Sequence, residues 1–333
     1  MQSFINENLI IFLMLLVCPK CKTVLIDWHK FLSCPSCKHI YKSKNGIVSF
    51  IDSSHEFYEG RYTETRDFES LMPKFLGPFR YPLFRLFTEL NMVTRAERFF
   101  RHRLFGKKNL KILDIACGGG WKCLTEYGEV FGVDLSFGSL QNSKKIYNNV
   151  YRADAFKLPF PNESFDFIVS MDFFEHISLP KKAVLLAELK RVLKHGGKIM
   201  MGMPMVSKEK MAKFTRSYLD LYKRYWIEQD DHIGLEPPRK VISHFKRAGF
   251  NVLKTYNYWV NLLMPLSYIK YLDNDYRKKS RFIDLNVRFS RFIVKHNILF
   301  GLYAVFMGPI ADIIDYLSPI DYGMGFLICV QKP

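Results

Sequence analysis

The stretch that decides the fold reads KILDIACGGG at residues 111–120 and continues as EVFGVDLS at residues 129–136. Both begin as short apolar runs and end in polar or glycine-rich segments, so both predict a buried strand followed by a turn. Further apolar runs follow at residues 149–154, 165–171 and 197–204, with helical stretches between them. This alternation predicts a parallel sheet with crossover helices.

The glycine-rich end of the first run indicates a nucleotide site. Residues 114–120 (DIACGGG) close a strand and open a helix, where small residues let the backbone approach a bound nucleotide closely. Asp134 ends the next strand twenty residues after Asp114, at the position whose carboxylate reads ribose hydroxyls. Residues 121–123 (WKC) supply no third glycine for a dinucleotide fingerprint, so the pattern favours adenosine without a pyrophosphate.

Four motifs within residues 111–204 resemble those of the class I S-adenosylmethionine-dependent methyltransferases, in the ubiquinone-biosynthesis-like group called methyltransferase type 11. ILDIACGGG resembles the first motif, VFGVDLS the second, and ADAFKLPFPNESFDFIVSMDFFEHI the third and fourth. LKRVLKHGGKIMMGMP resembles the segment after them, with His195 where the family commonly has proline. The resemblance implies an enzyme that uses S-adenosylmethionine, and an α/β, Rossmann-like fold with a seven-stranded sheet.

The same resemblance implies which residues contact the cofactor. Asp134 corresponds to the ribose carboxylate, Asp154 is expected to accept from the adenine amino group, and Ala155 to offer a backbone contact. The full set of expected cofactor residues is Asp114, Ala116, Gly118, Gly120, Asp134, Leu135, Asp154, Ala155 and Met171.

Four cysteines near the start have the spacing of a zinc site. Cys18 and Cys21 form one C-x2-C pair, Cys34 and Cys37 form another, and twelve residues separate the pairs. Two such turns supply four thiolates for tetrahedral zinc, which replaces a core that about 40 residues cannot build alone. The alternative is four reduced cysteines without a metal.

The segment around these cysteines resembles the small zinc-ribbon family that activates tRNA and protein methyltransferases. We therefore expect a zinc ribbon at residues 14–52, a linker and cap helix at 53–105, and a helical, basic and apolar insertion at 258–323. The S-adenosylmethionine-binding domain is expected to comprise residues 106–257 and 324–333, which include a helix at 238–248 and strands at 250–256 and 325–331.

Composition constrains the partners and the compartment. The 333 residues carry 49 Lys and Arg against 32 Asp and Glu, a net charge of +17, which favours anionic partners such as nucleic acid, anionic lipid or phosphorylated substrates. A role of this charge in solubility alone is the alternative. Seven cysteines, four of them in one metal-ligand pattern, indicate a reducing, cytoplasmic environment and not a disulfide framework.

The apolar start does not have the pattern of a secretory signal. Leu9 to Val17 are nine apolar residues, half of what a membrane-spanning helix requires, and no Lys or Arg precedes them. We expect Leu15 to Val17 to be the first strand of the ribbon. A native start at Met14 and an interfacial anchor are both left open.

Residues 258–323 are longer than the hairpin that this family normally has before its last strand. A basic run at residues 277–281 leads into a predicted helix with apolar and cationic sides. The apolar side contains Phe282, Leu285, Phe289, Phe292 and Ile293, and Arg281, Arg288, Arg291 and Lys295 lie toward another side. This pattern fits peripheral contact with the inner face of a membrane, whereas core packing or a homodimer interface is the alternative.

Two other features concern the methyl acceptor. Residues 211–228 place Phe214, Tyr218, Leu221, Tyr222 and Tyr225 on one side of a predicted helix, either as simple packing or as a substrate cover. His176 and His232 are weak candidates for a catalytic base, because neutral imidazole can accept a proton near pH 7, and helix capping or packing is the alternative.

The leading hypothesis is a methyltransferase for a small-molecule or lipid-linked acceptor, such as a quinone precursor or a glycan intermediate. A ribosomal RNA or tRNA methyltransferase is the alternative, because a ribbon ahead of a methyltransferase resembles the 23S ribosomal RNA guanine methyltransferases and the charge is high. MDFFEH at residues 171–176 stands where an Asn-Pro-Pro-Tyr type motif would support RNA. A non-catalytic partner-binding protein is the third hypothesis.

Overall fold

A computed structural model describes residues 16–28, 31–52, 59, 63, 92–258 and 272–333. The apolar start up to Leu15 and most of the expected linker lie outside the described residues. The helix expected from about Leu83 is described only from Met92, as α3 (Met92–Leu104).

Among the described residues, the sheet has eleven strands in the order β1-β2-β3-β4-β7-β6-β5-β8-β9-β11-β10. The seven strands from β7 to β10 form the α/β sheet that the sequence predicts, so the expected fold class is confirmed. From β4 through β7, β6, β5 and β8 to β9, adjacent strands in this order run parallel to one another. Strand β11 lies antiparallel between β9 and β10. These seven strands are β5 (Leu110–Ile115), β6 (Gly128–Asp134), β7 (Asn149–Arg152), β8 (Phe165–Met171), β9 (Leu193–Pro204), β10 (Asn251–Tyr258) and β11 (Gly325–Gln331).

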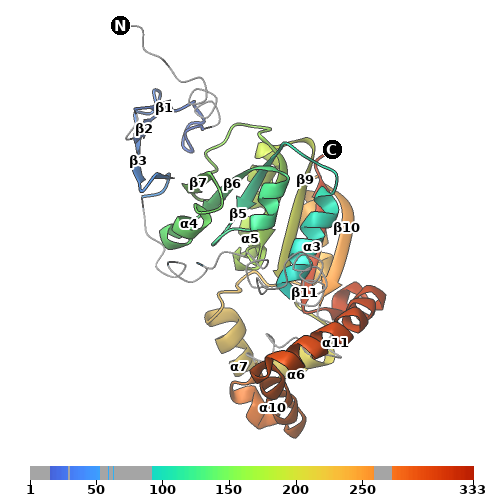
Figure 1. Ribbon diagram of the computed structural model, residues 1–333. Helices are drawn as coiled ribbons and strands as arrows, with labels where there is room; N and C mark the ends of the chain where they lie inside the picture. Colours follow the sequence, from blue (N-terminus) through green and yellow to red (C-terminus); the bar gives the residue numbers. More distant parts are fainter. Residues whose placement is uncertain (1–15, 29–30, 53–58, 60–62, 64–91, 259–271) are drawn as a thin grey trace.

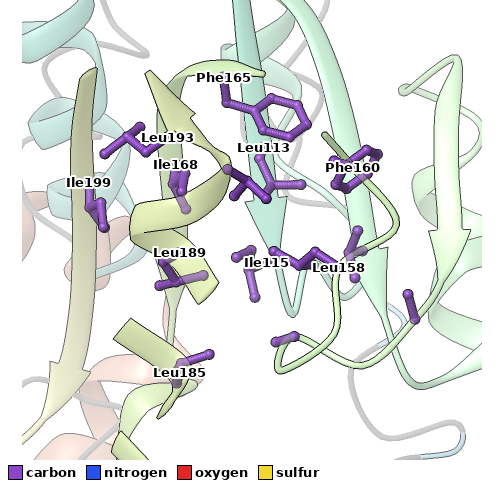
Figure 2. Packing of buried hydrophobic residues seen from close by; sticks show 14 of the residues in the cluster. Leu113, Ile115, Leu158, Phe160, Phe165, Ile168, Leu185, Leu189, Leu193 and Ile199 are labelled. Carbon is purple, nitrogen blue, oxygen red and sulfur yellow. The ribbon is translucent and has the colours of Figure 1, made fainter. Parts of the chain in front are cut away.

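Helices cover both faces of this sheet because its strands bury apolar side chains on both faces. One buried cluster joins the strands to α5 (Leu179–Val192) and α8 (Pro238–Arg247), and a second joins them to α3 and α4 (Phe137–Ser143). Figure 2 shows part of the first cluster, in which Leu185 and Leu189 of α5 pack with Leu113, Ile115 and Ile168 of the strands. Short helical turns η3 (Lys122–Glu126) and η4 (Phe174–His176) follow β5 and β8.

The cysteine-rich segment extends the sheet. Its strands are β1 (Ile26–Asp27), β2 (Phe31–Ser33), β3 (Ile40–Lys44) and β4 (Ile47–Ser49). Strand β4 pairs parallel with β7, with Val48 opposite Tyr151. The N–H of Phe50 donates to the carbonyl of Arg152 over 2.7 Å. Figure 1 shows β1 to β3 beside the β7 edge of the sheet.

A second set of contacts holds this segment to the rest of the chain. The N–H of Val17 donates to the carbonyl of Pro159 over 2.9 Å. The Lys22 ammonium lies 3.2 Å from Oε1 of Glu188 on α5, and Glu188 also pairs with Arg191. The cysteine-rich segment therefore docks at the β7 edge of the sheet, and not on the side of the insertion that precedes β11.

The apolar stretch at residues 211–228 does not form one helix. It divides into α6 (Lys210–Ser217), α7 (Leu219–Tyr222) and a π-helical turn η5 (Lys223–Glu228). Tyr218 separates α6 from α7 with φ −104° and ψ 77°, values outside the helical region. The prediction of one continuous helix was therefore wrong, although its aromatic side chains still pack together.

The insertion before β11 forms a helical hairpin below the sheet, beside α6 and α7 (Figure 1). It consists of η6 (Asp275–Lys279), α10 (Arg281–Lys295), α11 (Asn297–Leu317) and η7 (Ile320–Tyr322). Within the described ranges, none of the helices has the length and apolar character needed to traverse a bilayer.

Candidate functional site

The turn after β5 adopts a backbone that requires small residues. Ala116, Gly118 and Gly120 have φ values of 52°, 55° and 84°, in the left-handed region that favours glycine. A Cβ on Gly120 would also lie 2.7 Å from Cδ1 of Ile146, so the Ile146 side chain would have to shift. The DIACGGG sequence is therefore needed for this turn, which presents its backbone at the carboxyl edge of the sheet.

Asp134 connects this turn to the end of β6. Its Oδ2 accepts from the N–H of Gly118 over 2.9 Å, and its Oδ1 accepts from the N–H of Ser136 over 2.8 Å. Burial raises the pKa of Asp134, while the backbone N–H groups of Ser136, Gly118 and Leu135 act in the opposite direction. A carboxylate oxygen has more than one lone pair, so these bonds leave Asp134 able to accept from hydroxyl groups.

Asp114 lies behind the turn. Its side chain is 1% exposed, and its Oδ2 accepts from the hydroxyl of Tyr147 over 2.8 Å. The Tyr147 oxygen in turn accepts from the N–H of Trp121 over 2.6 Å. Asp114 therefore braces the turn through Tyr147, a residue for which the sequence pattern gave no signal.

The other expected cofactor residues lie at the same edge. The end of β7 pairs with the end of β6, which places Asp154 and Ala155 just beyond Asp134, and Oδ1 of Asp154 accepts from the N–H of Phe156 over 2.9 Å. The carbonyl of Leu135 accepts from Nε of Arg152 over 2.8 Å. Met171 ends β8 and is 7% exposed.

This donor and acceptor set fits the adenosine part of S-adenosylmethionine. Carboxylates at the ends of two neighbouring strands can accept from ribose hydroxyls and from an adenine amino group, and the glycine turn permits close backbone approach. When bound, the cofactor supplies a methyl group activated by a positively charged sulfur. The individual contacts of these residues with the cofactor stay predictions.

The two candidate histidines lie together, although the sequence separates them by more than fifty residues. The rings of His176 on η4 and His232 in the loop before α8 have centroids 5.1 Å apart. Burial lowers the pKa of His176, and burial together with the charge of His176 lowers the pKa of His232 to about 3. Both imidazoles are therefore neutral at physiological pH.

An aromatic cluster continues from these histidines toward the hairpin. The Trp226 ring lies 6.5 Å from that of His232, and Tyr222 stacks on Trp226 at 6.0 Å. Trp226 belongs to a buried cluster that includes Ile283 and Val287 of α10. Most of the predicted stripe, from Phe214 to Tyr225, packs against this cluster, so packing explains it.

The four N-terminal cysteines converge as their spacing predicts. Sγ of Cys18 lies 3.6 Å from Sγ of Cys37, Sγ of Cys21 lies 3.3 Å from Sγ of Cys34, and all four sulfurs lie within 4.8 Å of one another. All four cysteines are free of disulfides, and sulfurs around tetrahedral zinc lie about 3.8 Å apart. The donor set therefore fits zinc, whose binding stays a prediction.

Comparison with known proteins supports the assignment that the site geometry suggests. Residues 113–201 match the family described as methyltransferase domain. A demethylmenaquinone methyltransferase of Staphylococcus haemolyticus is 31% identical over 173 residues, which cover 44% of this chain and 71% of that protein. A demethylmenaquinone methyltransferase of Staphylococcus aureus is 36% identical over 105 residues, 28% of this chain and less than half, 43%, of that protein.

Similar solved structures include a Haemonchus contortus phosphoethanolamine N-methyltransferase 2 in complex with S-adenosyl-L-methionine. It is 21% identical with a TM-score of 0.46, over 80% of this chain and 60% of that chain. Another is a complex between the Haloferax volcanii Trm112 methyltransferase activator and a methyltransferase, at 18% identity and a TM-score of 0.45, over 73% of this chain and 92% of that chain. From the family match, the Staphylococcus haemolyticus relative and the strand order, the chain belongs to the class I S-adenosylmethionine-dependent methyltransferases.

Proposed function

We propose that this enzyme transfers a methyl group from S-adenosylmethionine to a lipid-linked acceptor of the quinone-precursor kind while it rests on an anionic membrane surface. The observation that carries the proposal is the outer face of the α10–α11 hairpin. This face is apolar and cationic, and the hairpin packs on the aromatic cluster that leads to His232.

The outer face exposes more large apolar side chains than a water-soluble surface normally does. In α10 the buried side contains Ile283, Val287 and Ile293, which leaves four large side chains outside. The exposed residues, each 37–76% accessible, are Phe282, Leu285, Phe289, Phe292, Leu299, Leu302, Phe306, Ile310, Ile313, Tyr316 and Leu317. Those on α11 recur every three or four residues, so they form one continuous stripe.

Cations accompany this apolar face. The side chains of Arg288 and Arg291 are 67% and 58% exposed and pair with Asp284 and Asp273, and that of Lys278 is 79% exposed and pairs with Asp275. Apolar residues combined with Lys and Arg on a helix that does not span the bilayer are typical of interfacial binding to anionic lipids. We therefore favour a lipid surface over a second copy of the chain, because exposed ion pairs contribute little and leave the Arg and Lys side chains able to contact anionic headgroups.

The relatives support the acceptor class. Two of the relatives that are similar in sequence are named for demethylmenaquinone, a lipid-soluble quinone precursor. A lipid-soluble acceptor resides in the membrane. An enzyme whose acceptor pocket lies against the membrane surface shortens the distance that the acceptor must travel out of the bilayer. RNA is the alternative anionic partner, and it would not require the exposed Phe and Leu side chains.

Vesicle binding tests this proposal. The full-length protein is sedimented with vesicles of phosphatidylcholine alone and of phosphatidylcholine with phosphatidylglycerol. We expect binding to the anionic vesicles and at least roughly a tenfold loss in the Phe289→Asp/Phe306→Asp variant, because burial of one Phe is worth roughly 1.5–3 kcal/mol. The matched control is Phe105→Asp, which changes a side chain that is 85% exposed at the end of α3.

Three outcomes would contradict the membrane proposal. The first is equal sedimentation of the wild type and the double variant. The second is a wild-type dimer that the double variant dissociates, which would assign the face to a second copy. The third is an absence of vesicle binding combined with RNA binding whose affinity falls steeply with salt, which would favour the RNA hypothesis.

A further inference from the structure

A buried carboxylate and two imidazoles meet at the carboxyl end of β8, outside the expected cofactor residues. Glu175 and His176 belong to η4, and His232 comes from the loop before α8. One potential ligand atom from each of the three lies within 4.8 Å of the other two. We infer that Glu175, His176 and His232 bind a divalent transition-metal ion.

The backbone holds the two segments in place. The N–H of Gly234 donates to the carbonyl of Glu175 over 2.7 Å, and a Cβ on Gly234 would lie only 1.9 Å from the carbonyl oxygen of Ile177. Glycine is therefore required for this close approach. The convergence of the three side chains is a consequence of the fold and not of a free loop.

The hydrogen bonds of His176 direct its second nitrogen into the cluster. Nδ1 lies 3.0 Å from the carbonyl oxygen of Asp231, which can only accept, so Nδ1 carries the proton and Nε2 carries a lone pair. Nε2 lies 3.8 Å from Oε1 of Glu175. Metal-binding histidines commonly donate their other N–H to a backbone carbonyl in this way, which fixes the ring and its tautomer.

The cluster contains buried polar atoms without a hydrogen-bond partner. Glu175 is 2% exposed and neither of its carboxyl oxygens has a hydrogen-bond partner, and His232 is 9% exposed with its Nδ1 also lacking one. The nearby Lys182 does not fill this role, because its Nζ donates to the carbonyl of Gly234 and to Oε2 of Glu236. Buried polar atoms normally have a partner, and a cation bound by the carboxyl group and the imidazoles would supply it.

The donor set selects the class of cation. Two imidazole nitrogens and one carboxylate suit zinc, iron and manganese, whereas calcium and magnesium prefer sites made of oxygen. Ligand atoms around a tetrahedral ion at 2.0–2.2 Å lie about 3.3–3.6 Å apart, so binding draws Nε2 and Oε1 together by a few tenths of an ångström. Three protein ligands leave a coordination position open, as in metal sites that contact a substrate.

The metal site does not depend on the proposed function, and its metal content is measured without an acceptor. The full-length protein is loaded with zinc and freed of excess ion. A thiol-directed mercurial then releases the zinc held by the four cysteines, and a chelator in denaturant releases the remainder. We expect close to one equivalent of zinc in the second fraction for the wild type and a loss of at least fivefold in Glu175→Gln and in His232→Asn.

The matched control is His244→Asn, which removes a neighbouring half-buried histidine whose Nε2 is bonded to Oε2 of Glu236 over 2.9 Å. It should keep the second equivalent. A Mn²⁺ titration followed by electron paramagnetic resonance gives an independent reading, because thiolates are poor ligands for this ion. Glu175→Gln replaces the buried carboxyl group with an amide of the same shape, and retained binding of S-adenosylhomocysteine shows that the variant is folded.

The inference is overturned if the wild type holds no zinc outside the mercurial-released fraction and shows no Mn²⁺ binding. It is equally overturned if Glu175→Gln and His232→Asn keep the second equivalent. Neither result would affect the membrane proposal, which the vesicle experiment tests separately.

Discussion

The hydroxyl of Tyr147 donates to Oδ2 of Asp114 over 2.8 Å, inside the fold and directly behind the glycine turn. Both residues are 1% exposed, and burial raises the pKa of Tyr147 well above its usual value, so the phenol stays protonated. This bond, with the N–H of Trp121 donating to the Tyr147 oxygen, fixes the turn from inside the fold.

The Tyr147→Phe substitution tests this arrangement. It removes the buried hydrogen bonds that the Tyr147 hydroxyl makes with the Asp114 carboxylate and the Trp121 N–H, which costs about 1–3 kcal/mol. We expect a lower free energy of unfolding in a denaturant titration and weaker binding of S-adenosylhomocysteine. Tyr151→Phe on β7 is the matched control and should change stability by less than about 0.5 kcal/mol. Equal stability of the two variants would contradict the bracing role.

Asp134 is expected to carry much of the cofactor affinity. Asp134→Asn keeps one oxygen, which can accept from the N–H of either Gly118 or Ser136, and it loses the negative charge that strengthens a bond from ribose hydroxyls. We expect S-adenosylhomocysteine to bind roughly 10- to 100-fold more weakly by calorimetry. Asp166→Asn changes a carboxylate that pairs with Lys194 and accepts from the N–H of Lys111, and it should leave affinity unchanged.

The raised pKa of Asp134 predicts two opposite pH effects. Burial places this pKa above 3.8, so the ionised carboxylate needed for ribose is lost earlier on acidification than in a free aspartate, and cofactor affinity falls with it. In the cofactor-free protein the same raised pKa means that this group's contribution to stability is present at low pH and is lost as pH rises through the folded-state pKa. Asp134→Asn should abolish both effects in calorimetry and thermal melts, and an unchanged pH profile in this variant would contradict the assignment.

Removal of zinc should loosen the edge of the sheet. Zinc bound by the four cysteines would join the turns that flank β1 to β3, so we expect chelation to speed hydrogen exchange at the N–H groups of Val17 and Phe50, which bond across to Pro159 and Arg152. Amides of β5 in the centre of the sheet should keep their protection. Cys34→Ser should reproduce the effect and Cys123→Ser should not. Unchanged exchange at Val17 and Phe50 after zinc removal would mean that the metal does not support the docking.

The central sheet could be predicted from the sequence because its strands are continuous apolar runs, the pattern of parallel strands that are buried on both faces. The strand expected at residues 165–171 is β8 at the same residues, and the last strand agrees in the same way. Asp134 could also be placed, because a carboxylate that ends a strand beside a glycine turn can lie only at the carboxyl edge.

The contacts between distant segments could not be predicted from the sequence. Ile47 to Ser49 is a short run without any mark of its partner, and its pairing with β7 depends on which edge the rest of the sheet leaves free. The break at Tyr218 involves no proline or glycine, so periodicity alone predicts one helix there. His176 and His232 meet because Gly234 lets two loops approach, a contact that periodicity does not encode.

The most direct test of the central claim is methyl transfer from radiolabelled S-adenosylmethionine to demethylmenaquinone embedded in vesicles that contain phosphatidylglycerol. We expect the label to appear in the quinone. The rate of methyl transfer should fall at least roughly tenfold in both Asp134→Asn and Phe289→Asp/Phe306→Asp and stay unchanged in Phe105→Asp. The contrary result is a protein that binds S-adenosylhomocysteine and the vesicles but leaves the quinone unlabelled, with the label appearing instead in added structured RNA.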